Sequence, residues 1–208
     1  MLELGWGEYC PQRRDHSNPD NGGRSARAWA EYFANGQVYV VDLTPKNFAD
    51  RDEWPNVHLY DRTSQADAAA LAEMHAVSGD FDIIIDDASH VSSLTIRSFE
   101  ILWPFVKPGG YYVIEDLHSS YHPWYFGPRE ANENPSAPVN PRHPTAMQYF
   151  KRIADEAFFR GTKRHGPKVN GSKFEWDCYP RKYWLGYEVE SVSFCAPQLI
   201  VIRKRLAS

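Results

Sequence analysis

The chain has 208 residues, of which 42% are hydrophobic and 24% charged, and its formal net charge is −4. This composition is typical of a globular protein, and the length fits a single domain, residues 1–208. The Lys and Arg residues are spread through an acidic chain, so we expect no nucleic-acid partner. Apolar runs such as Phe81–Ile85 are too short to cross a bilayer, and we expect no charged-then-apolar leader before the first strand. We therefore expect a cytoplasmic protein.

Apolar runs and helical patterns alternate along the first half of the chain. The predicted elements, in chain order, are a strand at Met1–Leu4, a helix from Arg24 to a stop at Asn35-Gly36, strands at Val38–Leu43 and Val57–Tyr60, and a helix at Ala66–Val77. The run at 38–43 is continuously apolar until Asp42, as expected for a strand buried on both faces of a parallel sheet.

The second half continues the alternation and then ends differently. Its predicted elements are a strand at Phe81–Ile85, a helical face from Ile96 to Val106 stopped by 107–110, a strand at Tyr111–Ile114, a helix at 144–159, and an antiparallel pair at Val189–Phe194 and Leu199–Arg203. This order predicts a doubly wound α/β sheet, mostly parallel, with a C-terminal antiparallel pair. In such sheets, ligands bind outside the carboxyl ends of the strands.

Two glycines and a carboxylate fall where such a sheet commonly holds an adenosine-containing cofactor. Gly5 and Gly7 follow the first strand and allow a ligand to approach the backbone, and Asp42 at the end of the second strand can accept from ribose hydroxyls. Asp61 follows the third strand, where it could meet an adenine amino group. A tight turn with solvated acids is the alternative. Cys10 stands where a dinucleotide fingerprint needs its third glycine, which disfavours NAD.

Carboxylates gather after two later strands. Asp86 and Asp87 end one strand, and Glu115 and Asp116 end the next. Four such groups at one sheet edge repel one another unless a cation compensates them, and oxygen ligands suit magnesium or calcium better than zinc. The sequence therefore predicts a metal site. His90, three residues after a candidate ligand, could take a proton from a metal-bound hydroxyl.

An aromatic and proline-rich segment follows the second carboxylate pair. Tyr121 and Trp124 could stack on a sugar or a ring, or could simply pack this non-helical segment onto the sheet. His143 could reach the acceptor if the segment folds over the crevice, although a lone loop histidine is more often solvated. The length and position of 117–144 predict an active-site lid.

Three segments resemble the metal-dependent sugar O-methyltransferases, such as the mycinamicin and demethylmacrocin enzymes. They are Leu2-Glu3-Leu4-Gly5, Asp86-Asp87-Ala88-Ser89-His90, and Glu115-Asp116-Leu117 after Pro108-Gly109-Gly110. The resemblance implies a class I methyltransferase, Rossmann-like fold that uses S-adenosylmethionine and Mg²⁺. It implies metal ligands at Asp87, Glu115 and Asp116, a general base at His90, and cofactor contacts at Glu3, Gly5, Ser25, Asp42 and Asp61. From its place in the loop, His143 is our other candidate for the base. We also predict that Gly7 and Asp86 border the cofactor.

The acceptor class rests on general likeness and size. Ala88 replaces the glycine of the family pattern, and the short chain looks more like the compact mycobacterial enzymes that 1-O-methylate 3-O-methylmannosides for methylmannose polysaccharides. An oligomannoside or a glycosylated natural product is therefore the expected acceptor, and a homodimer could complete the roof of the site. A catechol-type O-methyltransferase and a non-catalytic nucleotide-binding α/β module remain the alternatives.

Overall fold

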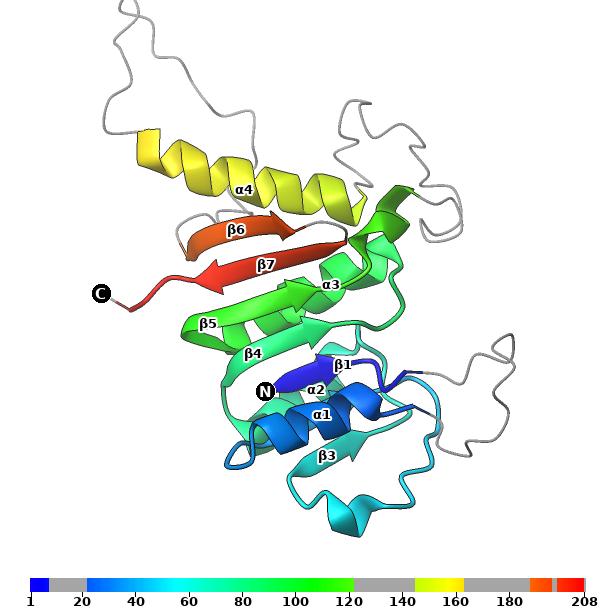
Figure 1. Ribbon diagram of the computed structural model, residues 1–208. Coiled ribbons are helices and arrows are strands. Elements are labelled where there is room, and N and C mark those ends of the chain that lie inside the picture. The colour runs from blue at the N-terminus through cyan, green and yellow to red at the C-terminus, as the bar shows by residue number, and fades with distance from the viewer. Residues whose placement is uncertain (8–21, 122–144, 163–187, 196–197, 208) are drawn as a thin grey trace, which may run out of the picture.

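A seven-stranded sheet with the order β3-β2-β1-β4-β5-β7-β6 forms the centre of the protein (Figure 1). The computed structural model describes residues 1–7, 22–121, 145–162, 188–195 and 198–207. Strands β1 to β5 pair in parallel, and β7 runs antiparallel to both β5 and β6. The predicted mostly parallel sheet with a closing antiparallel pair is confirmed. Across the described ranges, no helix combines the length and apolarity needed to span a membrane.

The strands are short at the start of the chain and longer at its end. They are β1 (Leu2–Leu4), β2 (Val38–Val41), β3 (Val57–Tyr60), β4 (Phe81–Asp86), β5 (Val106–Ile114), β6 (Val189–Cys195) and β7 (Leu199–Lys204). The α-helices are α1 (Arg24–Tyr32), α2 (Ala68–Ser78), α3 (Ser92–Leu102) and α4 (Ala146–Thr162). Short 3-10 helices lie at η1 (Arg51–Glu53), η2 (Trp103–Phe105) and η3 (Leu117–Tyr121).

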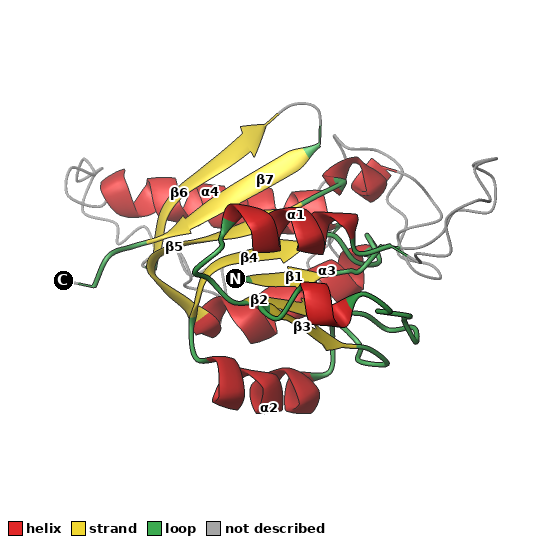
Figure 2. Ribbon diagram, turned by 60° about the horizontal axis from the view of Figure 1, so that its bottom comes forward, coloured by secondary structure: helices red, strands yellow, loops and turns green. Residues whose placement is uncertain are grey.

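Helices cover both faces of the sheet. Figure 2 shows α1 on one face and α2 on the other, and α3 packs against α2 and α4. Alternation along the strands divides the apolar residues between two cores, because successive side chains point to opposite faces. Leu2 and Leu4 belong to the larger core with α2, α3 and α4. Val38 and Val40 belong to the smaller core under α1. Glu3, between the two leucines, therefore faces α1.

The helix before β5 ends earlier than the sequence predicts. It stops at Leu102, and η2 follows with Pro104 in its first turn. Proline has no N–H to continue the helical bonding, so the chain turns there. Val106, predicted as helical, is already in β5, and residues 107–110 lie within that strand at a shift in its register with β4. The prediction that residues 107–110 end this helix was wrong, because Pro104 already ends the helical hydrogen bonding.

Side-chain caps set two helix starts. Asp67 accepts hydrogen bonds from the backbone N–H groups of Ala69 and Ala70, so α2 begins at Ala68 rather than at Ala66. At α4, Thr145 Oγ1 accepts from the N–H of Gln148, and Gln148 Oε1 accepts from the N–H of Thr145. This reciprocal pair is a capping box, and its Thr-x-x-Gln spacing is readable in the sequence.

Candidate active site

The register of the sheet places the ends of three strands side by side. Leu4 of β1 pairs with Asp86 of β4, which pairs in turn with Ile114 of β5. The residue after each strand is tied to the neighbouring strand by its backbone. The N–H of Asp87 donates to Leu4 O at 2.9 Å, and that of Glu115 donates to Asp86 O at 3.0 Å. The loops after β4 and β5 therefore leave the sheet together, as predicted for a shared crevice.

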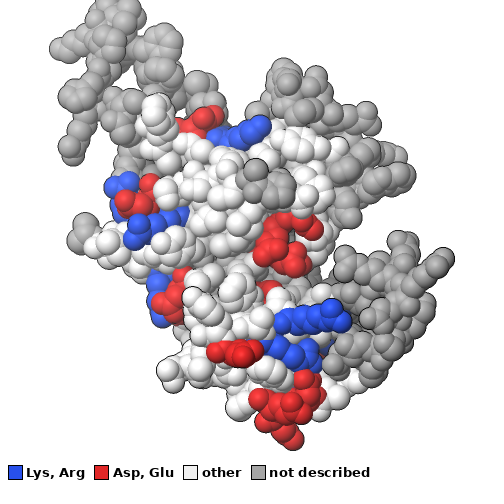
Figure 3. Space-filling view, viewed as in Figure 1, with Lys and Arg blue, Asp and Glu red and all other residues white. Residues whose placement is uncertain are grey.

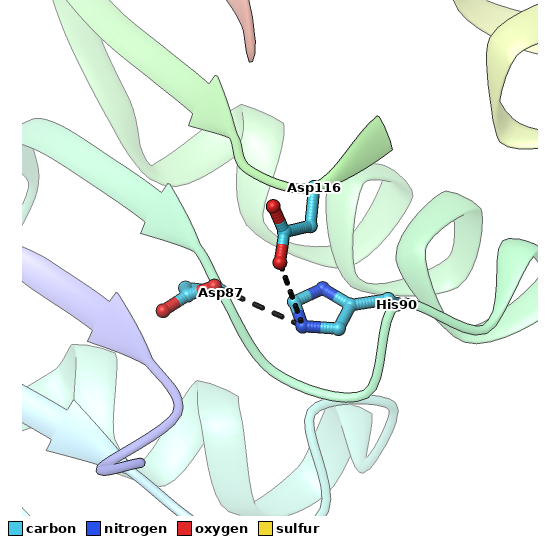
Figure 4. A group of neighbouring side chains, drawn as sticks. All are labelled: Asp87, His90 and Asp116. Atoms are coloured by element: carbon cyan, nitrogen blue, oxygen red, sulfur yellow. Dashed lines mark ion pairs between the residues drawn. The ribbon is translucent and has the colours of Figure 1, made fainter. Parts of the chain in front are cut away.

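Asp87, His90 and Asp116 form a compact cluster at this edge (Figure 4). His90 Nε2 lies 3.9 Å from Asp87 Oδ1 and 3.8 Å from Asp116 Oδ2. Each of the three residues offers a ligand atom, and these atoms lie within 4.8 Å of one another. Figure 3 shows acidic side chains gathered on the surface near the ends of β4 and β5. The carboxylate oxygens of this cluster fit a hard divalent cation, and the imidazole of His90 lies beside them.

The electrostatics of the cluster favour a cation as well. Burial, with a contribution from Asp116, raises the pKa of Asp87 to about 6. Burial and the charges of Asp87 and Asp116 also raise the pKa of Glu115, so Glu115 lies close enough to feel both carboxylates. Burial lowers the pKa of His90, which favours its neutral form. Ionising these neighbouring carboxylates together costs free energy because their negative charges repel one another. A metal ion bound between them would offset that repulsion.

Two residues of the cluster have strained backbones. His90 has φ of 56° and Asp116 has φ of 49°, both in the left-handed region that non-glycine residues seldom adopt. Such strain persists only where the surrounding structure enforces it, and it is common at functional sites. At His90 and Asp116 it accompanies side chains that turn toward the shared cluster.

The glycine turn after β1 brings two loops into contact. Gly5 has φ of 104°, and a Cβ there would lie 2.3 Å from the carbonyl oxygen of Asp87. Only glycine therefore lets this turn meet the metal-site loop. Gly7 also has a positive φ, of 80°, which continues the turn. The predicted use of these glycines for close backbone approach has a clear geometric basis, although the contact seen is to the chain itself.

Asp42 lies just past β2, which ends at Val41 rather than at Leu43. Its Oδ2 accepts from the N–H of Trp6 at 2.9 Å, and its Oδ1 accepts from the N–H of Thr44 at 2.8 Å. Lys46 Nζ lies 3.2 Å from the same Oδ1 and donates to Gly7 O at 3.2 Å. Asp61 Oδ2 accepts from the N–H of Lys46 at 3.2 Å. The predicted cofactor acids thus lie in one region, joined by a lysine that the sequence reading did not single out.

Glu3 is a buried acid beside the cluster, with 2% of its surface exposed. Burial raises the pKa of Glu3 to about 7, and a hydrogen bond with Ser25 of α1 opposes that shift. Among the described residues, its Oε2 has no hydrogen-bond partner. Ser25, predicted at the cofactor site, therefore lies next to Glu3, and the buried Oε2 is an acceptor that a ligand donor could satisfy.

Replacing Glu3 by Gln should stabilise the metal-free protein at high pH. A raised folded-state pKa means that the contribution of Glu3 to stability is full below pH 4.5 and is lost as pH rises through about 7. Chemical unfolding should therefore show Glu3→Gln gaining up to about 3 kcal/mol over wild type between pH 5 and pH 8. The same change at exposed Glu53 is the control. Equal pH dependence in the Glu3→Gln variant and the wild type would contradict this account.

The side chain of Asp86 is buried. It is 2% exposed and accepts hydrogen bonds from Ser98 Oγ and Gln65 Nε2. Asp86 shares a strand face with Ile84, two residues earlier, and Ile84 packs in the larger core. The carboxylate therefore faces α3, on the side of the sheet opposite α1, and the cofactor contact of Asp86 stays a prediction.

The remaining predicted residues divide into two groups. Tyr121 is 39% exposed and closes η3, so the start of the segment predicted as non-helical is a 3-10 turn. Trp124, His143 and most of the predicted lid lie outside the described residues.

The structure adds a second histidine that the sequence reading passed over. His118 Nδ1 lies 3.9 Å from Asp116 Oδ1, and its place two residues after Asp116 was the available signal.

This strand order, with a glycine turn after β1 and carboxylates after β2, β4 and β5, is that of a class I methyltransferase fold. A family described as "Methyltransferase domain" matches residues 21–117. The chain also superposes on the MycE methyltransferase of the mycinamycin pathway, solved with Mg and SAH, with a TM-score of 0.71 and 26% identity. That match covers 99% of this chain and 44% of MycE.

Curated relatives point to the same group of enzymes. A tetracenomycin-C rhamnosyl 3'-O-methyltransferase of Streptomyces olivaceus is 42% identical over 127 residues, which are 61% of this chain and 30% of that protein. The mycinamicin VI 2''-O-methyltransferase of Micromonospora griseorubida is 36% identical over 133 residues, which are 64% of this chain and 31% of that protein. The matched part thus spans about a third of each relative. The chain is related to sugar O-methyltransferases of macrolide and tetracenomycin pathways.

Proposed function

We propose that this protein is an S-adenosylmethionine- and Mg²⁺-dependent O-methyltransferase that acts on a sugar hydroxyl. The observation that carries the proposal is the convergence of Asp87, His90 and Asp116 beyond the ends of two adjacent strands. The relatives named above methylate sugars, and MycE was solved with Mg and SAH. Those properties support the assignment of the same reaction class to this chain.

The residues at this site fit both a divalent metal ion and S-adenosylmethionine. Asp87 and Asp116 would hold the metal, with Glu115 adding negative charge beside them. Gly5 and Gly7 would give backbone access, and Asp42 and the buried Oε2 of Glu3 would supply acceptors for the hydroxyl and ammonium groups of the cofactor. When bound, the cofactor supplies an activated methyl group, and the metal orients the acceptor oxygen and stabilises its developing charge.

His90 has the position and the protonation state of a general base. Its Nε2 points between the two carboxylates, and burial lowers its pKa so that the neutral form accepts a proton at neutral pH. Its role would be to remove the proton of the acceptor hydroxyl as the oxygen attacks the methyl carbon. The strained loop that holds His90 would fix the ring before the substrate arrives.

For the acceptor, we propose a glycoside, either an oligomannoside precursor of methylmannose polysaccharide or a glycosylated natural product. The curated relatives support the second choice by their rhamnosyl and mycinamicin substrates. The first rests on the general likeness of this chain to the compact mycobacterial enzymes.

An acceptor panel tests this assignment. The protein should transfer a labelled methyl group to a 3-O-methylmannoside or to a rhamnosylated or macrolide glycoside, with products identified by mass spectrometry. Planar catechols should give no product, because two coplanar aromatic hydroxyls present a different geometry to the metal-site residues. Methylation of catechols alone would replace the sugar assignment by a catechol-type one, and cofactor binding without turnover on any acceptor would favour a non-catalytic module.

A further inference from the structure

A buried amide links the core of the protein to the metal-site loop. Gln65 precedes α2 and is 6% exposed. Its Nε2 donates to Asp86 Oδ1 at 3.2 Å, and its Oε1 accepts from the backbone N–H of Ser89 at 3.1 Å. Ser98 Oγ, from α3, donates to the other oxygen of Asp86. The loop after β4 is thus hydrogen-bonded to a side chain from the segment between β3 and α2.

The hydrogen bond to Ser89 lies directly before His90, the residue of this loop with a left-handed backbone. The N–H of Asp87 is held by β1, through Leu4 O, and the N–H of Val91 donates to Ser89 Oγ at 3.3 Å. Between these anchors lies His90, whose φ of 56° needs support from its surroundings. Gln65 supplies that support from outside β4 and its loop, one residue before His90 and two after Asp87.

We propose that Gln65 is a positioning residue for the metal-site loop, which it holds through the Ser89 N–H so that Asp87 and His90 face Asp116. The inference rests on the proposed function, since it assigns a role in binding the metal. The side chain at position 65 must accept one hydrogen bond and donate another. A neutral amide accepts from Ser89 and donates to Asp86, whereas an apolar side chain would leave both partners unpaired.

The test replaces Gln65 by Met, which keeps the length of the side chain and removes both hydrogen bonds. Mn²⁺ is the probe, because it prefers the same oxygen ligands as Mg²⁺ and free Mn²⁺ is measured directly by electron paramagnetic resonance. Gln65→Met should weaken Mn²⁺ binding by about tenfold, the lower end of the range for loss of a partner bonded directly to a ligand, because Gln65 acts on the ligands only through the loop. The matched control is Ser98→Ala, which removes a donor to Asp86 and a long contact of 3.4 Å from Gln65 Nε2, but leaves the acceptor that Gln65 offers to the Ser89 N–H.

Amide hydrogen exchange gives a readout independent of metal. The Ser89 N–H should exchange slowly in wild type and in Ser98→Ala, and at least about tenfold faster in Gln65→Met, because its acceptor is gone. Thermal unfolding confirms that each variant is folded. If Gln65→Met does not fold, Gln65→Asn takes its place in the exchange experiment. The amide stays polar but is one carbon shorter, so it should not reach the Ser89 N–H, and the Ser89 amide should again exchange faster than in wild type.

The two measurements separate two kinds of failure. A folded Gln65→Met that binds Mn²⁺ as well as wild type, or that keeps its Ser89 amide protected, overturns the role of Gln65. So does an equal loss of Mn²⁺ affinity in Ser98→Ala, because the effect would then come from Asp86 and not from the loop. A wild-type protein that binds no Mn²⁺ at all overturns the proposed function instead, and the exchange result alone then decides whether Gln65 holds the loop.

Discussion

Removal of divalent metal with EDTA should abolish methyl transfer, and Mg²⁺ should restore it. Asp87 and Asp116 place carboxylate oxygens around one point, and their repulsion leaves them poorly placed to bind an acceptor hydroxyl without a cation. A metal ion that stabilises the developing oxygen charge contributes several kcal/mol, so the rate should fall by about 10³-fold or more. Transfer of a labelled methyl group, before and after Mg²⁺ is returned, measures this.

Asp116→Asn tests the same site without a chelator. The amide keeps the shape of the side chain and the tolerance for its left-handed backbone, but it removes the charge. The Mg²⁺ concentration for half-maximal rate should rise by more than the roughly 10–100-fold that loss of an outer partner causes. Asp82→Asn is the control, because Asp82 is an exposed residue of β4 paired with Lys107. Full activity of the metal-stripped protein would exclude the metal-assisted mechanism.

The second large effect is expected at His90. His90→Ala should lower kcat by about 10²–10⁴-fold, as is usual when a general base is lost. Affinity for S-adenosylhomocysteine, measured by calorimetry, should stay nearly unchanged, because Gly5, Asp42 and Asp61 of the predicted cofactor site follow β1, β2 and β3 rather than β4.

A second substitution separates chemistry from backbone strain at His90. Alanine is strained at φ of 56°, whereas asparagine tolerates that conformation and has no basic nitrogen. An equal loss of kcat in His90→Ala and His90→Asn assigns the loss to the missing imidazole. If both variants keep the wild-type rate, His90 is not the base. His118, beside Asp116, and the predicted His143 are then the residues to substitute.

Much of the site follows from the sequence because parallel strands share an edge. Asp87, Glu115 and Asp116 come directly after apolar runs, and the pairing of β4 with β5 brings those runs together. The orientation of Asp86 was also readable. Asp86 lies two residues after Ile84 in β4, so its side chain points to the same core face as Ile84, whereas Asp87 points away from it.

Other features depend on contacts that no local pattern encodes. Gln65 meets Ser89 across 24 residues of chain, and Lys46 meets Gly7 across 39. Neither spacing has a periodicity that could have revealed it. The early end of α3 and the start of α4 belong to a different category. Pro104 and the Thr145–Gln148 capping pair were visible signals that the prediction passed over.

The position of β7 in the sheet affects how the chain must be assembled on the ribosome. β7 is synthesised after the other six strands of the described sheet, yet it pairs with β5 near the middle of the chain and buries Ile200 and Ile202 in the larger core. Until residues 199–204 emerge, β5 presents an unpaired edge and the core beside it lacks those two side chains. An exposed edge of this kind invites pairing with other chains. Nascent chains stalled before residue 199 should therefore be prone to aggregate, and the strand that completes the sheet also ends that vulnerability.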